Sequence, residues 1–422
     1  MKKILDLHIH SKYSRACSKD LELPKIARAC EVKGVDICAT GDFTHPAWFT
    51  HIKESLKEDT DGVYKLKNEN NSTRFILGVE IASIKKHKDK TRRLHLCVFA
   101  PNLTVVEKFN KKLEARGINL RADGRPILGL TAKEILSLML ETDERMVLIP
   151  AHAWTPWFGV FGSKSGYDSL EECFEDLTPH IFAIETGLSS DPVMNWRLSA
   201  LDQITLVSNS DAHSLGKLGR EANVLNFAGA KAVTYDKIME IIRKGDSKDF
   251  LYTIEFYPEE GKYHLYGHRD CAFVCSPEET KKLKNICLKC GKPLVIGVMN
   301  RVLELSDRRV DEIKKLQKIP YKSVVPLAVI LADVFNCGVN TKRVKRIYDK
   351  LIQEIGSELF ILLEASTEKL QAVAGAAVAR AIDKARRGDI FIKPGYDGVF
   401  GVVKIFKDGE SSERVGQTLI AL

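Results

Sequence analysis

The chain has 422 residues, of which 44% are hydrophobic and 28% charged, as in well-packed globular proteins. It has no apolar run of about eighteen residues, and its start, MKKILDLHIH, lacks the apolar stretch of a signal peptide. These features exclude an integral membrane protein and predict a cytoplasmic location, and the length predicts two or three domains.

The net charge of +8 is unevenly distributed along the chain. Residues 1–230 carry a net charge of +1, and residues 231–422 carry +7. A basic second half suits a polyanionic partner such as DNA. A positively charged surface that only keeps the protein in solution is an equally good interpretation of the charge alone.

Short apolar runs alternate with helical patterns through residues 1–230. Helical spacing occurs in 22–33, 104–116, 131–142 and 193–203. Nearly continuous apolar strands separated by helices predict a parallel sheet, and we expect a (β/α) barrel, with an open doubly wound sheet as the alternative. The seven runs are ILDLHIH, VDICATGD, FILGVEIA, RLHLCVFA, MVLIPAHA, IFAIETG and ITLVSNSDAH.

The rest of the chain divides into three predicted parts. Residues 231–250 form a linker helix, 251–300 a small module of short strands, and 301–422 a mainly helical domain that binds DNA. Ser366 or Thr367 can cap a helix there. A sliding clamp is a further possible partner, for which GQTLIAL at the end of the chain is only a faint candidate. The basic residues expected along the DNA backbone are Arg343, Lys345, Arg346, Arg380, Lys384, Arg386 and Arg387.

Titratable side chains gather at the ends of the predicted strands. Asp6, His8 and His10 alternate in the first strand, so they share one face. In a β/α barrel the carboxyl ends of the strands meet at one mouth, where active sites form. The later strands bring Asp42 with His45, Glu80, His95, His152, Glu185, and Asp211 with His213.

A single histidine in an apolar strand is more often a core residue than a metal ligand. Several buried polar groups at one mouth would be costly unless cations satisfied them. Imidazole and carboxylate ligands suit Zn²⁺, Mn²⁺ or Fe²⁺, with Mg²⁺ also possible, and the number of ligands implies two or three ions. Such ions lower the pKa of bound water and stabilise charge on a leaving oxygen. We expect Glu185 to orient a histidine or polarise the attacking water, with His152 and Asp211 also in the catalytic set.

Nine of the ten cysteines fall into two classes. Five of them are scattered through the first half and are expected to be reduced thiols. The segment CAFVCSPEETKKLKNICLKC places Cys271, Cys275, Cys287 and Cys290 in two close pairs, which predicts one structural zinc. His268 is a possible spare ligand.

Several motifs resemble the polymerase-and-histidinol-phosphatase (PHP) domain: DLHIHSKYS, GVE at 78–80, PAHA at 150–153 and SNSDAH at 208–213. The resemblance implies a distorted (β/α)7 barrel with three metal ions that hydrolyses phosphoesters. Its first ion would be held by His8, His10, Glu80 and Asp211, its second by Glu80, His95 and His152, and its third by His213. Where that family usually has Asp-His, this chain has Gly41-Asp42. Asp42 would therefore replace a histidine on the third ion, with His45 as the alternative.

Two loops beside the expected metals suit a nucleic acid. IKKHKDKTRR at 84–93 has six basic residues and one acidic residue, and Lys85, Lys86, Arg92 and Arg93 are expected to contact phosphates. HAWTPWFGVF at 152–161 provides Trp154, Trp157 and Phe158, which could stack on an extruded base. The alternatives are a solvated basic loop and simple packing over the barrel mouth.

The whole arrangement resembles the endonuclease Q family, most distinctively in CGKPLVIGVMNRVLELSDR, PYKSVVPLAVIL and RRGDIFIKPGYDGVFG. The resemblance implies a repair nuclease that cuts DNA on the 5′ side of uracil, hypoxanthine, xanthine or abasic sites. The products would carry a 3′-hydroxyl and a 5′-phosphate. The alternatives are a small-molecule phosphatase on the same barrel and a DNA-binding scaffold without catalysis.

Overall fold

All seven predicted strands form, as do the helices expected at 22–33, 104–116 and 131–142, so the α/β class is confirmed; the helix expected at 193–203 is reduced to the short helix Pro192–Asn195 and a 3-10 turn at Ser199–Leu201. The computed structural model describes residues 1–406 except 89, 277–278 and 280–283. The predicted strands are β1 (Lys2–Asp6), β2 (Ile37–Ala39), β5 (Arg74–His87), β6 (Lys90–Ala100), β8 (Val147–Pro150), β9 (Ala183–Glu185) and β10 (Thr205–Val207). The helices are α1 (Leu23–Lys33), α2 (Pro46–Ser55), α3 (Leu103–Ala115), α4 (Ala132–Leu140), α5 (Leu170–Phe174), α6 (Pro192–Asn195) and α7 (Tyr235–Lys244).

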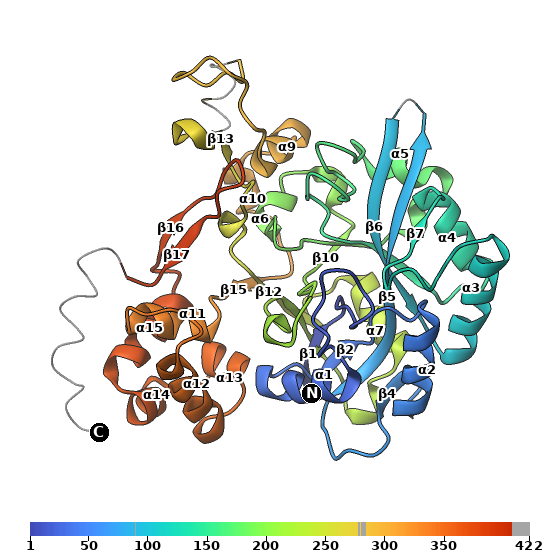
Figure 1. Ribbon diagram of the computed structural model, residues 1–422, viewed down its shortest axis with the longest axis horizontal. Coiled ribbons are helices and arrows are strands. Elements are labelled where there is room, and N and C mark those ends of the chain that lie inside the picture. The colour runs from blue at the N-terminus through green and yellow to red at the C-terminus, as the bar shows by residue number, and fades with distance from the viewer. Residues whose placement is uncertain (89, 277–278, 280–283, 407–422) are drawn as a thin grey trace. The chain divides into compact units, whose positions relative to one another are not determined.

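The sheet is mixed rather than parallel. β1, β2 and β5 are parallel, but β6 is antiparallel to both β5 and β8. The segment 84–93, predicted as a loop, instead prolongs β5 and β6 as a long hairpin in which Lys85 pairs with Arg92 (Figure 1). A link this short permits a hairpin, whereas a parallel crossover needs a dozen residues or more. Further strands are β3 (Leu56–Thr60), β4 (Val63–Leu66), β7 (Ile127–Leu128), β11 (Ala222–Asn226) and β12 (Phe250–Glu255).

β9 and β10 form a separate parallel pair that joins its neighbours through single hydrogen bonds. The Ala153 N–H donates to the Glu185 carbonyl (2.9 Å) on the β8 side. On the other side, the Asn209 and Asn223 side-chain oxygens accept the N–H groups of Leu7 and Ser208, at 2.8 and 2.9 Å. Side-chain amides thus replace the regular ladder, which accounts for the distortion of the barrel.

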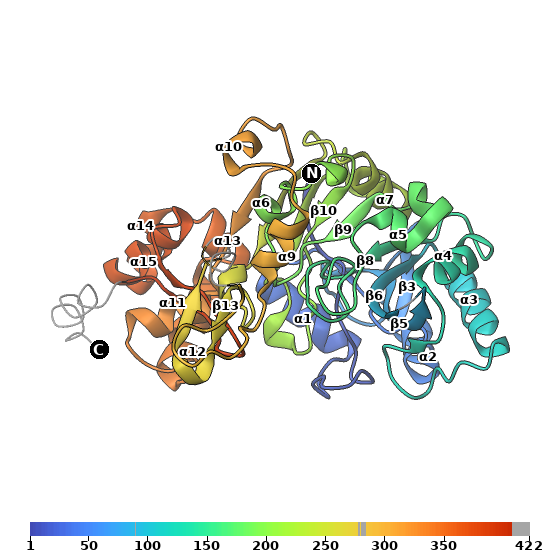
Figure 2. The ribbon, with the colours of Figure 1, turned by 90° about the horizontal axis from the view of Figure 1, so that it is seen from above.

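The barrel encloses a hydrophobic core that includes Leu5, Ile76, Phe99, Ile149 and Val207. Helices α2, α3 and α4 lie on the outer side of β5 and β6 (Figure 2). The start of α4 is fixed by a capping box between Thr131 and Glu134. Apolar side chains fill the barrel interior and helices cover its outer side. The polar residues at the strand ends therefore line the barrel mouth.

A second compact unit contains residues 32–34, 255–297 and those from Lys322 onward. Ser366 caps α14 as predicted, and Gly375, at φ +88°, separates α14 from α15. Its elements are β13 (Tyr266–His268), β14 (Phe273–Cys275), α11 (Leu327–Val334), α12 (Lys342–Glu354), α13 (Glu358–Leu363), α14 (Thr367–Ala374), α15 (Ala376–Arg386), β16 (Phe391–Lys393) and β17 (Val402–Lys404).

The two units divide the chain differently from the predicted domains. The barrel unit contains 1–31, 35–254 and 298–321, so it includes α9 (Val298–Leu305) and α10 (Val310–Ile313). β15 (Tyr321–Ser323) lies where the chain passes from one unit to the other. β12 pairs with β11 and therefore extends the main sheet. None of the helices in the described part of the chain has the length and apolar character needed to cross a bilayer.

Candidate metal centre

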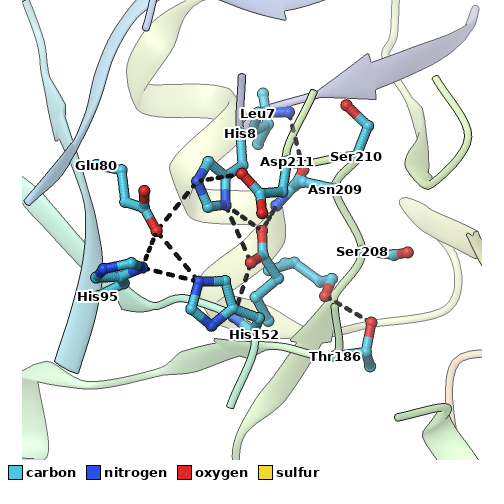
Figure 3. Close-up of polar contacts among 12 residues, drawn as sticks. Leu7, His8, Glu80, His95, His152, Thr186, Ser208, Asn209, Ser210 and Asp211 are labelled. Atoms are coloured by element: carbon cyan, nitrogen blue, oxygen red, sulfur yellow. Dashed lines mark hydrogen bonds and ion pairs between the residues drawn. The ribbon is translucent and has the colours of Figure 1, made fainter. Parts of the chain in front are cut away.

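Three groups of potential metal ligands meet at the barrel mouth. Figure 3 shows His8, Glu80, His95, His152 and Asp211 of these groups close together. Within each group the ligand atoms all lie within 4.8 Å of one another, and all of these side chains except Asp211 belong to buried residues. The groups are His8, His10, Glu80 and Asp211; Glu80, His95 and His152; and His8, Cys97 and Glu185.

Glu80 belongs to the first two groups. Its Oε1 lies 2.8 Å from His95 Nδ1 and 3.2 Å from His152 Nε2, and its Oε2 lies 3.3 Å from His10 Nε2. Burial opposes ionisation of this carboxyl, yet the neighbouring imidazoles of His95 and His8 hold its pKa well below the usual range. An ionised carboxylate shared in this way is suited to bridge two cations.

The first group has the donor arrangement of a cation site. His8 Nε2 is buried, has no hydrogen-bond partner among the described residues, and lies 3.5 Å from Glu80 and 3.6 Å from Asp211. His10 Nε2 lies 3.0 Å from the same carboxylate oxygen of Asp211. A buried polar atom without a partner is costly, and a divalent cation between these atoms would satisfy it. The residues therefore fit a metal ion.

The second group depends on the direction of β6. His95 was expected near the carboxyl end of a parallel strand, but it pairs with Ala82 as β6 enters the barrel. It still reaches the mouth because an antiparallel strand begins where its neighbours end. Burial lowers the pKa of His95 to about 4, so the imidazole is neutral near pH 7, as metal ligation requires.

Glu185 lies behind the first group. Both of its oxygens are 3.1 Å from His8 Nδ1, and it also accepts the His152 N–H (2.8 Å) and the Asn209 amide (2.8 Å). A carboxylate on the far nitrogen of a ligating histidine fixes its tautomer and orientation. Of the two roles considered for Glu185, this geometry favours the orientation of His8.

Cys97 completes the third group, although its position in the sequence indicated only an ordinary thiol. It shares a face of β6 with His95, because the two residues are two apart. Burial raises the pKa of Cys97 to about 12, so the group remains a thiol at neutral pH. Since the thiolate is the form that binds metals, we interpret Cys97 as packing beneath His8.

The residues expected around a third ion are not brought together as one group among the described residues. Asp42 accepts hydrogen bonds from the Ser11 N–H (2.7 Å) and from the hydroxyls of Ser11 (2.6 Å) and Ser14 (2.8 Å). The turn at Asp42, with φ +47°, directs its carboxylate to this first loop. His45 instead stacks on Tyr13, with ring centroids 4.2 Å apart, and His213 Nδ1 lies 3.5 Å from Asp211.

The aromatic loop after β8 separates into packing and exposed residues. Trp154 is fully buried and donates to Asn195 Oδ1 (2.8 Å), so the packing alternative holds for it. Trp157 is 50% exposed, with the Arg93 guanidinium 5.1 Å from its ring centroid. Phe158, at the strained φ of +68°, stacks on His95 at 4.2 Å. The loop thus presents one open aromatic face beside the metal ligands.

The basic residues of the β5–β6 hairpin also divide into two sets, one held within the fold and one exposed. Arg92 stacks on Tyr167, at 4.2 Å from the ring centroid, and donates to the Gly166 carbonyl, so it supports the aromatic loop. Lys85 and Lys86 are exposed on the same hairpin. Their position suits contact with a polyanion, whereas Arg92 is already held within the fold.

Arg301 on α9 also supports the aromatic loop; it lies within the distinctive segment CGKPLVIGVMNRVLELSDR, but nothing in that motif indicated this role. It is 8% exposed, donates to the Phe161 and Tyr167 carbonyls (both 3.1 Å), and forms an ion pair with Asp168. Long-range contacts with backbone carbonyls leave no pattern in a sequence, so only the folded chain reveals this role.

Replacing Arg301 with alanine is expected to lower the free energy of unfolding of the barrel unit by about 2–4 kcal/mol, because two buried carbonyls lose charged donors. Urea unfolding followed by tryptophan fluorescence measures the change. Arg309→Ala is the control, because that side chain is 81% exposed and forms an ion pair with nearby Asp311 at the surface. An equal effect of the two substitutions would contradict the role of Arg301.

A separate group in the second unit contains His268, Cys271, Cys287 and Cys290. It contains three of the four predicted zinc ligands together with His268, the possible spare ligand, and Cys275 lies outside this group. Cys275 ends β14 and is buried with Tyr266 and Leu294 in the small core of this module. His268 Nδ1 lies 3.6 Å from Cys290 Sγ. Three thiolates and one imidazole fit tetrahedral zinc.

Two of the basic residues expected on DNA are engaged inside the second unit. Arg386 donates to the carbonyls of Ile361, Leu362 and Ala365, and Lys384 pairs with Asp389 (2.9 Å). Arg386 thereby fastens α15 to the end of α13, because the carbonyls at a helix end need donors, whereas Lys384 binds the segment that follows α15. The segment proposed to meet a sliding clamp, 416–422, lies outside the described residues.

Comparisons with known proteins cover nearly the whole chain. The family described as the MJ0043 C-terminal domain matches residues 326–389. Uncharacterized protein YqxK of Bacillus subtilis (strain 168) is 30% identical over 423 residues, covering 96% of this chain and 100% of YqxK. Uncharacterized protein MJ0043 of Methanocaldococcus jannaschii is 30% identical over 276 residues, covering 64% of this chain and 34% of MJ0043.

Two solved structures are similar over the same extent. The lesion-specific endonuclease PfuEndoQ from Pyrococcus furiosus has a TM-score of 0.84 and 33% identity, covering 96% of this chain and 95% of that one. Endonuclease Q in complex with a 27-mer duplex that carries an abasic lesion at the active site has a TM-score of 0.83 and 32% identity, covering 99% of both chains. Similarity in sequence and structure over this length places the chain in the endonuclease Q family.

Proposed function

We propose that the protein is a DNA repair endonuclease that hydrolyses the phosphodiester on the 5′ side of a deaminated base or abasic site. Water adds to phosphorus and the bond to the 3′ oxygen breaks, so one product carries a 5′-phosphate and the other a 3′-hydroxyl. The observation that carries this proposal is Glu80, which belongs to two ligand groups at the mouth of a barrel. Membership of the endonuclease Q family supports it.

Two divalent cations would be held at this mouth. The first group would supply two imidazoles and two carboxylates, and the second would supply His95, His152 and the shared Glu80. Zn²⁺, Mn²⁺ and Fe²⁺ suit this donor set, and Mg²⁺ remains to be tested beside them. When bound, such a pair provides hydroxide near neutral pH and stabilises the charge on the leaving oxygen.

The protein's own residues position this chemistry. Glu185 holds the ring of His8 in one orientation, and Thr155 Oγ1, 2.9 Å from His152 Nδ1, does the same for His152. Phe158 covers one face of His95 and keeps water from it. The ligand side chains are therefore fixed before a substrate arrives, which reduces the reorganisation needed for reaction.

The exposed face of Trp157 would receive a damaged base that has been turned out of the duplex. Arg93 beside it adds a positive charge close to the DNA backbone. Lys85 and Lys86, farther along the hairpin, would contact phosphates on the flanking duplex. This assignment keeps Trp157 as the stacking residue and treats Trp154 as structural.

Trp157→Ala is expected to weaken binding of uracil-containing duplex about 5- to 150-fold, because base–aromatic stacking contributes about 1–3 kcal/mol. Fluorescence anisotropy with a labelled duplex in Ca²⁺ measures the change. Trp157→Phe retains a ring and should recover most of the affinity. If undamaged duplex loses affinity to the same extent, Trp157 does not contact the lesion.

The function is tested with duplexes that contain uracil, hypoxanthine, xanthine, an abasic site or no lesion, each incubated with Mg²⁺, Mn²⁺ or Zn²⁺. The expected result is a nick on the 5′ side of the lesion, with a 3′-hydroxyl on one end and a 5′-phosphate on the other. Hydrolysis of p-nitrophenyl phosphate with intact DNA would favour a small-molecule phosphatase instead. Retention of DNA without any cleavage would favour a scaffold.

A further inference from the structure

Arg125 lies beside the shared carboxylate, on the loop between α3 and β7. Its Nη1 is 2.8 Å from Glu80 Oε2. The Arg125 side chain is 23% exposed, whereas the Glu80 side chain is inaccessible. The guanidinium therefore lies between the buried ligand cluster and solvent, on the side from which a substrate would approach.

The loop that carries Arg125 is fixed against the loop after β1. The Gly124 N–H donates to the Tyr13 carbonyl (3.1 Å), and Asp123 Oδ1 accepts the Arg125 N–H (3.1 Å). A Cβ atom at residue 124 would lie 2.2 Å from Asp42 Oδ2, so only glycine allows this approach. The backbone of Arg125 is thus held in place, and mainly its side chain is left to move.

The present partner of Arg125 is an atom that a metal ion would use. Glu80 Oε2 is 2.8 Å from the guanidinium and 3.3 Å from His10 Nε2, a ligand atom of the first group. A divalent cation in that group would bind the same carboxylate and repel the arginine at short range. A guanidinium next to such a cation needs an anion as its partner, and its planar fork matches the oxygens of a phosphate.

We propose that Arg125 binds a non-bridging oxygen of the scissile phosphodiester once divalent cations have taken over Glu80. This inference rests on the proposed function, since it names the group that the arginine contacts in that substrate. Arg125 then exchanges one anionic partner for another: the carboxylate in the metal-free protein and the phosphate in the complex. It would stabilise the charge that builds up on the phosphate oxygens during hydrolysis.

Full-length Arg125→Ala and Arg125→Lys are compared with the wild-type chain and with Arg121→Ala, which removes an exposed arginine from the same loop. Three quantities are measured: metal content by mass spectrometry, affinity of the Mn²⁺-loaded protein for inorganic phosphate by calorimetry, and single-turnover cleavage. We expect Arg125→Ala to keep its metals, bind phosphate about tenfold or more weakly, and cleave about 100-fold or more slowly. Arg125→Lys should be intermediate, and Arg121→Ala should match the wild type.

Two results would overturn the proposal. Loss of metal together with cleavage would mean that Arg125 only positions Glu80, and unchanged phosphate affinity would mean that it does not bind the substrate anion. Failure of the wild-type chain to nick any damaged duplex would refute the proposed function. In that case the phosphate titration would still decide whether Arg125 contacts an anion at the metal centre.

Discussion

Glu80→Gln is expected to slow single-turnover cleavage by at least about 10³-fold, more than the roughly 10- to 100-fold typical of residues that only support a metal ligand. The amide keeps the shape of the side chain but removes the negative charge that two ligand groups share. Two cations close together need that charge between them, because otherwise their mutual repulsion is uncompensated. One substitution should therefore empty both sites.

Metal analysis separates this explanation from simple unfolding. The Glu80→Gln protein should lose its active-site metals, while the zinc proposed for the second unit should remain as an internal reference. Its affinity for duplex DNA should stay within a few-fold of the wild-type value. Glu107→Gln, on the exposed face of α3, is the control. Retention of both active-site ions by Glu80→Gln would contradict the bridging role.

The sequence indicated the first ligand group well because two local rules agree there. Alternation that continues beyond the end of β1 at Asp6 puts His8 and His10 on one face, and Glu80 and Asp211 end or follow apolar runs. Residues placed by such local patterns are brought together in the fold. Their use of metal ions remains a prediction.

Strand direction could not be predicted in the same way. An apolar run reports burial but not orientation, so β6 was taken as parallel although it returns along β5 as a hairpin. His95 was identified as a candidate ligand by its residue type, but its arrival at the barrel mouth on an antiparallel strand was not predicted. Asp42 shows the complementary problem: its place after β2 predicted a metal ligand, but the Ser11 and Ser14 hydroxyls donate to its Oδ2 atom, and its Oδ1 atom lies 3.4 Å from His10 Nδ1.

Sequence patterns did not predict the roles of three residues, Arg125, Arg301 and Trp157. The two arginines act through contacts with residues 45 and more than 130 positions away. The aromatic loop gave no means of separating Trp157 from Trp154, since the two differ only in burial. Exposure and long-range pairing are set by tertiary packing, which a single sequence does not record.

Cys287→Ser is expected to remove one zinc per chain and to unfold the module around residues 255–297. The core of this module includes few fully buried apolar groups, among them Tyr266 and Leu294, so hydrophobic burial contributes little. Structural zinc contributes about 10–16 kcal/mol of apparent binding free energy, which is folding free energy in such modules. Limited proteolysis should therefore cleave this segment first, and excess chelator should reproduce the effect in the wild-type chain.

The fourth zinc ligand can be identified by comparing His268→Ala with Cys275→Ala. The imidazole of His268 belongs to the group with three thiols, whereas Cys275 lies outside that group, in a module core that also contains Cys287. His268→Ala should therefore lower zinc affinity by about 100-fold or more, since the loss of a direct ligand exceeds the roughly 10- to 100-fold effect of outer residues. Cys275→Ala should keep the zinc and lose only about 1–2 kcal/mol of packing. If Cys275→Ala loses the metal and His268→Ala retains it, the site consists of four cysteines, and the position of His268 beside Cys290 has no part in zinc binding.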